Sequence, residues 1–512
     1  MMTRKEFILL ALITLFGAIL RFTHLSALSL WLDEGYTAWA ANHSQQDIIS
    51  LIRADTNPPL YYLLLHFWTH FFGRGEAGLR SLSALAGTLQ IPIVYLIARR
   101  LLRPEADSQP HPTLRASAPF VATILFALSF AQYWYSREAR FYELLCFLTT
   151  LSFYFLLRYL DSPRIGWLLL LSVTFATALY THNMMLAQLP GFAVAAFLLP
   201  SRRRPIQRIP GALAFTGMLT LLYFPWLLSL SWQIHRVNAY FWVSRPTFQT
   251  LADDLAGLCG IRHLWTWDRY ISRFNIQVST FVPNVTMFFL ACSLILAIFT
   301  LRQSARRTAL ALFALALTPP LITAAYSEIG TPIFMMKPFL FSVVPLCILI
   351  AAPLAWARPA YAVPWAAIAV FMFAVNVAAF IAEQVNENWR AAAQYVSAIP
   401  GDHRLILFVA ADGQLPFDYY FAPGPTDFQT GLPHGFFASN PPQAMQRVTS
   451  RRDLDPLRKL LTSRHFSQII LVYCHTVFID PRQLTLGYLT RRYPHPRMTD
   501  FDDVQVWQFQ PR

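Results

Sequence analysis

The chain has 512 residues, of which 55% are hydrophobic and only 13% are charged, with a mean hydropathy of +0.40. A soluble protein carries about 25% charged residues, so this composition excludes an ordinary soluble domain and predicts repeated membrane spans. The formal net charge is +14. Because the arginines cluster in short loops between apolar stretches, membrane topology explains this charge, and we expect no nucleic-acid partner.

About eleven apolar stretches are long enough to cross a bilayer. They are residues 6–24, 79–99, 117–135, 141–159, 165–182, 184–200, 210–231, 280–301, 308–326, 338–356 and 361–382. With the N-terminus in the cytoplasm, the inner loops collect the basic residues, including Arg99, Arg100, Arg203 and Arg306, which is the positive-inside pattern. The odd number of spans predicts a multi-pass protein with its C-terminal domain outside. We expect the membrane to be a bacterial plasma (inner) membrane.

The first outer segment, residues 25–78, belongs to the transmembrane domain that we assign to residues 1–382. Residues 31–41 are rich in aromatic residues and alanine, which predicts a helix lying in the membrane interface. Ser44 and Asp47 have the spacing of a second helix start. Residues 60–72 follow two prolines and predict a third helix, which we keep on the outer surface.

Residues 383–512 differ in composition from the apolar stretches before them, and they predict a small α/β domain outside the membrane. Helices are expected over 389–397 and 454–463, and strands over 404–410, 468–473 and 504–509. No glycine-rich phosphate loop follows a strand, so we expect no nucleotide site. The cysteines are scattered without Cys/His ligand spacing, so we expect no zinc site.

Acidic residues in the first outer segment are the strongest signal for chemistry. Asp33 and Glu34 are adjacent in an aromatic, apolar setting, where carboxylates are costly to desolvate unless they are paired or used. One of them could act as a general base toward a hydroxyl group, although acids also favour a helix N-terminus. Asp55 is either a second carboxylate of the same cleft or a turn cap. His66, on an apolar helix, is more often structural than catalytic.

Basic residues form the second signal. Arg137 and Arg140 lie with Glu138 and Tyr142 in the short turn after the third span. Arginine binds phosphate through bidentate hydrogen bonds, and a local ion pair with Glu138 is the alternative.

Two further residues stand at predicted outer ends of spans. Lys337, one of three lysines in the chain, either snorkels to the interface or binds an anionic head group. His182 either contacts a sugar or ends its helix. On this topology the carboxylates and cations all lie at one outer face, which suits chemistry on an anionic lipid carrier.

At these residues the sequence resembles the GT-C type membrane glycosyltransferases, and within them the branch of protein O-mannosyltransferases and lipid A aminoarabinose transferases. The matching segments are Trp31-Leu32-Asp33-Glu34, residues 55–62, residues 78–85, residues 136–142 and Tyr180-Thr181-His182. The resemblance covers mainly residues 1–200. Lys337 matches more loosely, because family members often carry arginine near that position.

The resemblance implies a GT-C-like α-helical polytopic fold and an inverting, metal-independent transfer of sugar from a polyprenyl-phosphate carrier, without a cofactor, to a lipid, glycan or protein acceptor. It implies that Asp33 is the base and that Glu34 positions donor or acceptor; if the acceptor is itself a phosphate, Asp33 only orients the donor. The residues implied to hold the carrier phosphate as leaving group are Arg137, Arg140 and Lys337. The remaining implied substrate-binding residues are Asp55, His66, Glu138, Tyr142 and His182.

Two other functions remain open at this point. A lipid-linked-sugar flippase or transporter predicts ionisable residues near mid-span and internal repeats, whereas most ionisable residues here stand at span ends and no clear repeat is visible. A non-catalytic envelope assembly subunit predicts a C-terminal domain that binds a partner.

Overall fold

The computed structural model describes residues 2–102, 112–201, 204–239, 243, 245–258, 303–356, 358–383, 386–433 and 449–511. Its contacts divide the chain into two compact units. The helical unit comprises Met1–Thr23, Arg80–Trp232 and Val243–Gln384, and the mixed unit comprises His24–Leu79, Gln233–Trp242 and Val385–Arg512. This grouping differs from the predicted domain division, because residues 24–79 pack with the C-terminal residues.

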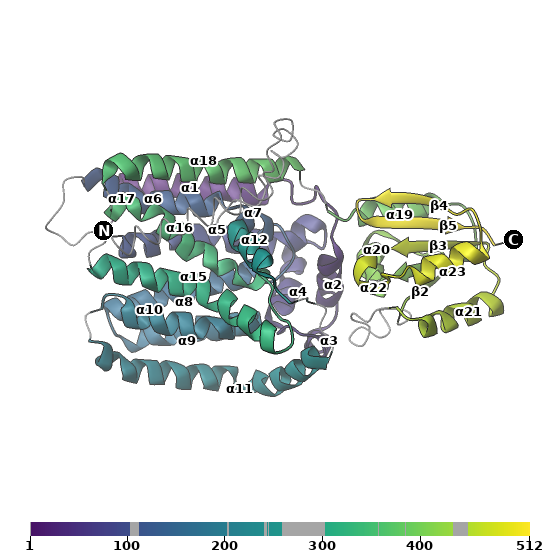
Figure 1. Cartoon of the computed structure of the whole chain (residues 1–512), viewed down its shortest axis with the longest axis horizontal. Helices are drawn as coiled ribbons and strands as arrows, with labels where there is room; N and C mark the ends of the chain where they lie inside the picture. Colours follow the sequence, from purple (N-terminus) through teal and green to yellow (C-terminus); the bar gives the residue numbers. More distant parts are fainter. Residues whose placement is uncertain are drawn as a thin grey trace. The chain divides into compact units, whose positions relative to one another are not determined.

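The helical unit is built from apolar helices that run side by side (Figure 1). In chain order they are α1 (Arg4–Phe22), α5 (Glu76–Leu101), α6 (Pro112–Ala127), α7 (Phe130–Tyr135), α8 (Tyr142–Asp161), α9 (Ile165–Leu179), η1 (Asn183–Gln188), α10 (Leu189–Leu198), η2 (Pro205–Arg208), α11 (Ile209–Ala239), α12 (Phe248–Leu258), α15 (Gln303–Ile329), η4 (Lys337–Ser342), α16 (Val343–Ala351), α17 (Pro353–Trp356) and α18 (Pro359–Glu383). The first turn of α5 and the last residues of α11 belong to the mixed unit.

Six of the described helices are long and apolar enough to cross a membrane. They are Glu76–Leu101, Tyr142–Asp161, Pro205–His235, Ala305–Ile329, Lys337–Trp356 and Pro359–Ala382. The predicted multi-span membrane class is therefore confirmed, while the count of about eleven spans stays a prediction. The stretches 117–135 and 184–200 contain shorter or interrupted helices, and the predicted span 280–301 lies outside the described residues.

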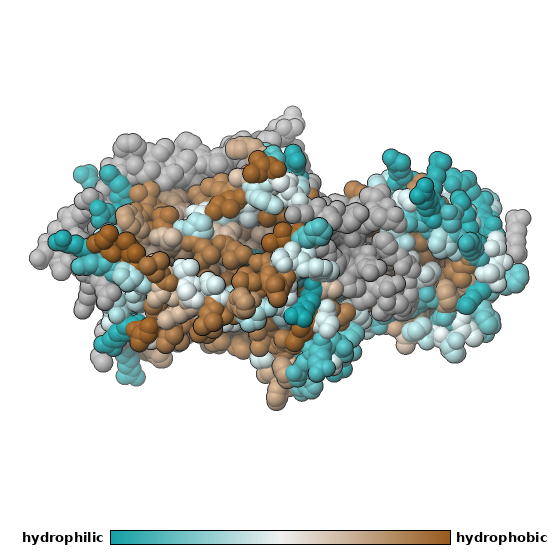
Figure 2. All heavy atoms as spheres, turned by 90° about the horizontal axis from the view of Figure 1, so that it is seen from below, coloured by the Kyte–Doolittle hydropathy of each residue, from teal (hydrophilic) through white to brown (hydrophobic). Residues whose placement is uncertain are grey.

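Exposed apolar side chains cover the flanks of the helical unit. Phe7, Leu213, Leu221, Leu228 and Phe371 are each more than half exposed. Figure 2 shows this apolar surface with polar side chains gathered at the ends of the helices. Such a surface is unfavourable in water and favourable against lipid tails, where helices satisfy their backbone groups internally.

The first outer segment forms the three helices that its sequence predicts: α2 (Leu32–Ala41), α3 (Gln45–Arg53) and α4 (Leu60–Phe72). Ser44 caps α3 by accepting a hydrogen bond from the backbone N–H of Asp47, as its spacing predicts. Ile48 and Ile52 of α3 pack in a buried cluster with Ala40 of α2 and Tyr62 of α4. Their location in the membrane interface stays a prediction.

Within the described residues, the C-terminal part of the mixed unit contains a five-stranded sheet with strand order β2-β1-β3-β5-β4. Its strands are β1 (Arg404–Val409), β2 (Phe428–Gly431), β3 (Gln468–Tyr473), β4 (Arg497–Phe501) and β5 (Val504–Phe509). β1 pairs in parallel with β2 and β3, and β5 pairs antiparallel with β3 and β4. The predicted strands at 404–410, 468–473 and 504–509 are therefore present.

Helices cover both faces of this sheet (Figure 1). They are α19 (Trp389–Ala398), α20 (Gln414–Tyr420), α21 (Leu454–Ser463), α22 (Thr476–Ile479) and α23 (Leu484–Arg492), with short turns η5 (Ala411–Gly413) and η7 (Arg451–Asp453). Leu405 and Leu407 of β1 face a core shared with α21, while Ile406 and Phe408 face one shared with α19. The apolar run of β1 is thus explained by burial on both faces.

Candidate functional site

A cluster of cations and aromatic rings lies in the helical unit where the turn after α7 enters α8. The guanidinium of Arg140 lies 4.6 Å from the ring centroid of Phe141 and 5.8 Å from that of Tyr142. Lys337 Nζ lies 5.9 Å from the Tyr142 ring, and the His182 and Phe141 ring centroids are 4.9 Å apart. Two cations held over aromatic faces form a positive site that is preorganised for an anion.

Arg137 and Glu138 share this turn, but they contact the surrounding protein. Arg137 donates to the backbone carbonyls of Thr23 and Leu20 at the end of α1, and its guanidinium lies 4.9 Å from the Tyr133 ring. The indole N–H of Trp134 donates to the carboxylate of Glu138. These contacts hold the turn against α1 and α7, so they position the loop that carries Arg140.

Two buried ionisable residues of the helical unit are not among the predicted site residues. Arg21 of α1 and Glu143 of α8 are both fully buried. A Cβ atom at Gly87 would lie 2.6 Å from Glu143 Oε1 and 3.0 Å from Arg21 Nε, so both side chains flank this glycine. Ionisable groups inside apolar spans are rare and are usually functional, and their positions within predicted spans are the sequence signal that points to them.

In the mixed unit, Asp33 and Glu34 occupy the first turn of α2. The carboxylate of Glu34 is buried and accepts a hydrogen bond from the backbone N–H of Trp31. Asp33 is partly exposed, and its backbone carbonyl accepts from the Thr37 hydroxyl. A negative charge at a helix N-terminus interacts favourably with the helix dipole, so the first turn of α2 is a suitable place for a carboxylate.

The packing of α2 on α20 fixes this first turn. A Cβ atom at Gly35 would lie 2.6 Å from the backbone nitrogen of Pro416. Leu415 of α20 packs against Tyr36 and Trp39 of α2. The glycine that follows the two carboxylates is therefore required for the close approach of these helices.

The other predicted residues of this segment have structural contacts. Asp55 is buried directly after α3, where its carboxylate lies 3.4 Å from the Thr56 hydroxyl. The Nδ1 atom of His66 lies 2.9 Å from the backbone carbonyl oxygen of Ala41, which joins α4 to the end of α2. This contact fits the structural role that its apolar helix favours, and a part for His66 in substrate binding stays a prediction.

A second group of titratable residues, which the sequence did not reveal, responds to the charge of Asp33. Asp412 follows β1 and His475 follows β3. The charges of Asp33 and Glu387 affect the pKa values of both residues. Burial raises the pKa of Asp412 to about 6; the His475 charge opposes this rise, and the negative charges of Asp33 and Glu387 add to it. Burial lowers the pKa of His475, but its bond to Glu387 and the nearby carboxylates outweigh burial and raise it above its ordinary value.

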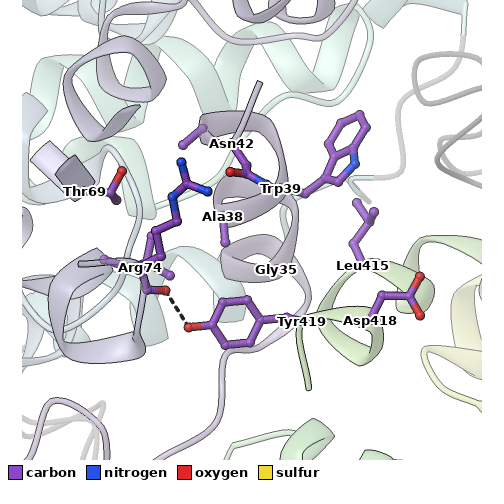
Figure 3. A pocket seen from close by; sticks show the side chains of 11 residues that line it. Gly35, Ala38, Trp39, Asn42, Thr69, Arg74, Leu415, Asp418 and Tyr419 are labelled. Carbon is purple, nitrogen blue, oxygen red and sulfur yellow. Dashed lines mark hydrogen bonds between the residues drawn. The ribbon is translucent and has the colours of Figure 1, made fainter. Parts of the chain in front are cut away.

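A cavity of about 400 Å³ lies on another face of α2. Its lining residues are Gly35, Ala38, Trp39, Ala41, Asn42, Thr69, Arg74, Leu79, Leu415, Asp418 and Tyr419. Figure 3 shows the Tyr419 hydroxyl reaching the backbone carbonyl of Arg74, at 2.7 Å. At 100° per residue, Asp33 lies roughly 200° around the helix from Gly35, so this cavity is separate from the carboxylate.

The structure therefore brings predicted residues together within each unit. In the helical unit Arg140, Tyr142, His182 and Lys337 converge around one aromatic pair. In the mixed unit Asp33 and Glu34 share the first turn of α2. The convergence of the carboxylates with the cations in a single pocket stays a prediction.

Comparison with known proteins agrees with the resemblance in the sequence. The family model described as dolichyl-phosphate-mannose-protein mannosyltransferase matches residues 56–229. No curated protein matches the chain significantly.

Two solved structures of ArnT from Cupriavidus metallidurans are similar along almost the entire chain. The apo structure has 14% sequence identity and a TM-score of 0.49, covering 98% of this chain and 99% of that one. The structure bound to undecaprenyl phosphate has 14% identity and a TM-score of 0.48, covering 100% of both chains. Over residues 56–229 the chain is similar to the dolichyl-phosphate-mannose-protein mannosyltransferases, which confirms the family resemblance found in its sequence.

Proposed function

We propose that this protein is a glycosyltransferase of the GT-C type that transfers a sugar from a polyprenyl-phosphate carrier to an acceptor in the cell envelope, at the outer face of the membrane. The observation that carries the proposal is the pair of cations, Arg140 and Lys337, placed over the Tyr142 ring. Such a site suits the phosphate of a lipid carrier. The matching family model is named for a dolichyl-phosphate-linked donor, which supports the same class of substrate.

The proposed reaction is a single displacement. Asp33 takes the proton of an acceptor hydroxyl while the acceptor oxygen forms a bond to the anomeric carbon of the sugar. The bond between that carbon and the carrier phosphate oxygen breaks, and the phosphate leaves with the electron pair. Arg140 and Lys337 stabilise the negative charge that develops on the phosphate. One displacement at the anomeric carbon inverts its configuration.

The remaining predicted residues have supporting roles in this proposal. Glu34 holds the first turn of α2 through the N–H of Trp31, so it fixes the direction of Asp33. Arg137 ties the Arg140 turn to the end of α1. His182 and Tyr142 line the phosphate site, and Asp55 and His66 support the outer helices.

Replacement of Asp33 by asparagine tests the proposal. Membranes containing full-length wild type or D33N are supplied with labelled polyprenyl-phosphate sugars, and label leaving the carrier for an acceptor is measured. The expected result is a loss of transfer of at least 100-fold, because general-base catalysis contributes about 10²–10⁴-fold. D47N, which changes an exposed carboxylate on α3, is the matched control and should retain activity.

Each outcome of this assay separates the competing functions. Undiminished transfer by D33N contradicts the base assignment. Counterflow of the labelled donor without product supports a flippase or transporter. A pure, correctly folded protein that neither transfers nor transports supports an assembly subunit. Mass spectrometry of surface lipids and glycans, with and without the gene, identifies the sugar and the acceptor.

The outer location has its own test. Single cysteines are placed at position 26, beside the α2 segment, and at position 207, in the loop before α11, and are labelled from outside with a membrane-impermeant maleimide. We expect labelling at position 26 alone. Labelling at position 207 alone would reverse the topology and remove the proposed site from the outer face.

A further inference from the structure

Glu387 joins three separate parts of the mixed unit through one side chain. Its Oε1 atom lies 2.6 Å from Nε2 of His475, directly after β3. Its Oε2 atom accepts hydrogen bonds from the Trp389 indole, at 2.7 Å, and from the backbone N–H of Leu32, at 3.0 Å. Leu32 is the first residue of α2 and directly precedes Asp33. Glu387 therefore bonds to the helix turn that carries the proposed base.

The backbone of Glu387 strengthens this attachment. Its carbonyl oxygen accepts a hydrogen bond of 2.5 Å from the Ser29 hydroxyl, and the phenol of Tyr420 accepts from the N–H of Leu30 at 2.8 Å. Leu32 itself packs against the core that contains Trp389. The segment from Ser29 to Leu32 is thus held by residues of the C-terminal part at three successive points.

The position of His475 and Asp412 in the sheet is the one at which α/β proteins place their functional groups. β1 and β3 are parallel neighbours, so their carboxyl ends lie at the same edge of the sheet. Asp412 follows β1 and His475 follows β3 at this edge. Ligands and reactive groups of open α/β sheets lie at the carboxyl ends of the strands, and here Asp33 acts electrostatically on both residues.

The charges of this cluster explain why a histidine is needed there. Asp33, Glu387 and Asp412 are carboxylates that act on His475, and Glu34 and the Cys474 thiol are the neighbouring titratable groups in the chain. The Oδ1 atom of Asp412 is buried without a hydrogen-bond partner in the described part of the chain. Several carboxylates in one place repel each other unless a cation is among them. A protonated His475 supplies that cation.

We propose that Glu387 and His475 are positioning residues for Asp33. Glu387 fixes the first turn of α2 through the N–H of Leu32, and the imidazolium of His475 holds the Glu387 carboxylate in place through their ion pair. This inference rests on the proposed function, since it gives the C-terminal part a role in the same reaction. The C-terminal part thereby becomes a component of the catalytic centre of a lipid-phosphate glycosyltransferase, in addition to any role in acceptor selection.

Replacement of His475 by glutamine is the first test, since Gln Nε2 can reach Glu387 but carries no charge. His475 has a left-handed backbone, with φ of 50°, and Gln483 has the same conformation in this chain, so glutamine fits the position. Transfer from labelled polyprenyl-phosphate sugars is measured with the full-length protein between pH 5 and 9. At pH 6 we expect kcat to fall about 10-fold, with KM for the donor unchanged, because glutamine cannot supply the charge that His475 carries beside Glu387. This loss should disappear as the pH rises through the pKa of His475.

E387Q is the second variant, and because it removes the ion pair with His475, its loss of kcat should also be larger at pH 6 than at pH 9. H465Q is the matched control, because His465 is exposed and lies before β3, at the opposite end of the strand from His475. A folded H475Q protein with the wild-type pH profile would overturn the inference. An equal loss of kcat at every pH in both variants would also overturn it, because a purely structural role gives that result. The D33N assay tests the proposed function separately, so a loss in D33N with a normal H475Q profile rejects only this inference.

Discussion

The imidazole of His475 and the carboxylate of Glu387 form a hydrogen-bonded pair in which Nε2 and Oε1 are 2.6 Å apart. The pair raises the pKa of His475 above its ordinary value. A group whose pKa is higher in the folded state than in the unfolded state stabilises the folded protein. This stabilisation is fully present at pH values below the unfolded-state pKa, and it disappears as the pH rises through the folded-state pKa.

H475Q should therefore unfold more easily than wild type at pH 6 and nearly equally at pH 9. We expect a difference of about 1 kcal/mol at pH 6, typical of one partly exposed charged hydrogen bond. Thermal unfolding of the purified full-length protein, followed by tryptophan fluorescence at both pH values, measures it. A destabilisation that is larger at pH 9 would contradict the charge-based explanation.

Gly35 should tolerate no side chain. In G35A the new Cβ atom would lie 2.6 Å from Pro416 nitrogen, so α2 and α20 must move apart. We expect a loss of about 1–3 kcal/mol from this overpacking, together with reduced transfer because Asp33 shifts with α2. G75A is the control, since nothing lies within 4 Å of its added Cβ. Equal stability and activity of G35A and G75A would show that the close helix contact is not needed.

The ion pair between Arg404 and Asp427 should stabilise the sheet. Their side chains are only 9% and 1% exposed, and Arg404 Nε and Nη2 lie 2.8 and 2.6 Å from the two carboxylate oxygens of Asp427. R404M leaves a buried carboxylate unpaired and should cost about 3–5 kcal/mol. R458M removes an exposed pair with Asp455 and should cost no more than about 1 kcal/mol. Denaturant unfolding compares the two variants.

Arg140 should contribute to donor binding through its charge. R140Q removes the cation beside Phe141 and Tyr142, so we expect KM for a labelled polyprenyl-phosphate sugar to rise about 10-fold and kcat to fall as well. Arg158 provides the control, because it also stacks on an aromatic ring, that of Trp167, but lies at the other end of α8. If R158Q and R140Q reduce transfer equally, the phosphate site is not at Tyr142.

Much of the fold could be predicted from the sequence, because local signals decide it. Ser44 and Asp47 alone predict the start of α3, and the prolines before Leu60 predict α4. β1 and β3 are apolar runs because both faces are buried. β2 and β4 were missed, since they are the edge strands of the sheet and β4 exposes polar side chains such as Arg497.

The site was predicted only in part, because its contacts join distant residues. The turn carrying Arg140 and the first turn of α2 are visible as short motifs. Glu387, in contrast, bonds to Leu32 across 355 residues, and no local pattern indicates this. Asp412 and His475 stand after two predicted strands, but only the parallel pairing of those strands shows that they share an edge.

The mixed unit has a consequence for biosynthesis, because it is assembled from segments at both ends of the chain. Residues 24–79 leave the ribosome about 300 residues before α20, on which α2 packs, and a contact that spans so much chain forms late. During that interval Gly35 and its neighbours have no α20 to cover them. The nascent protein can therefore complete the packing around Gly35 only after α20 has been synthesised.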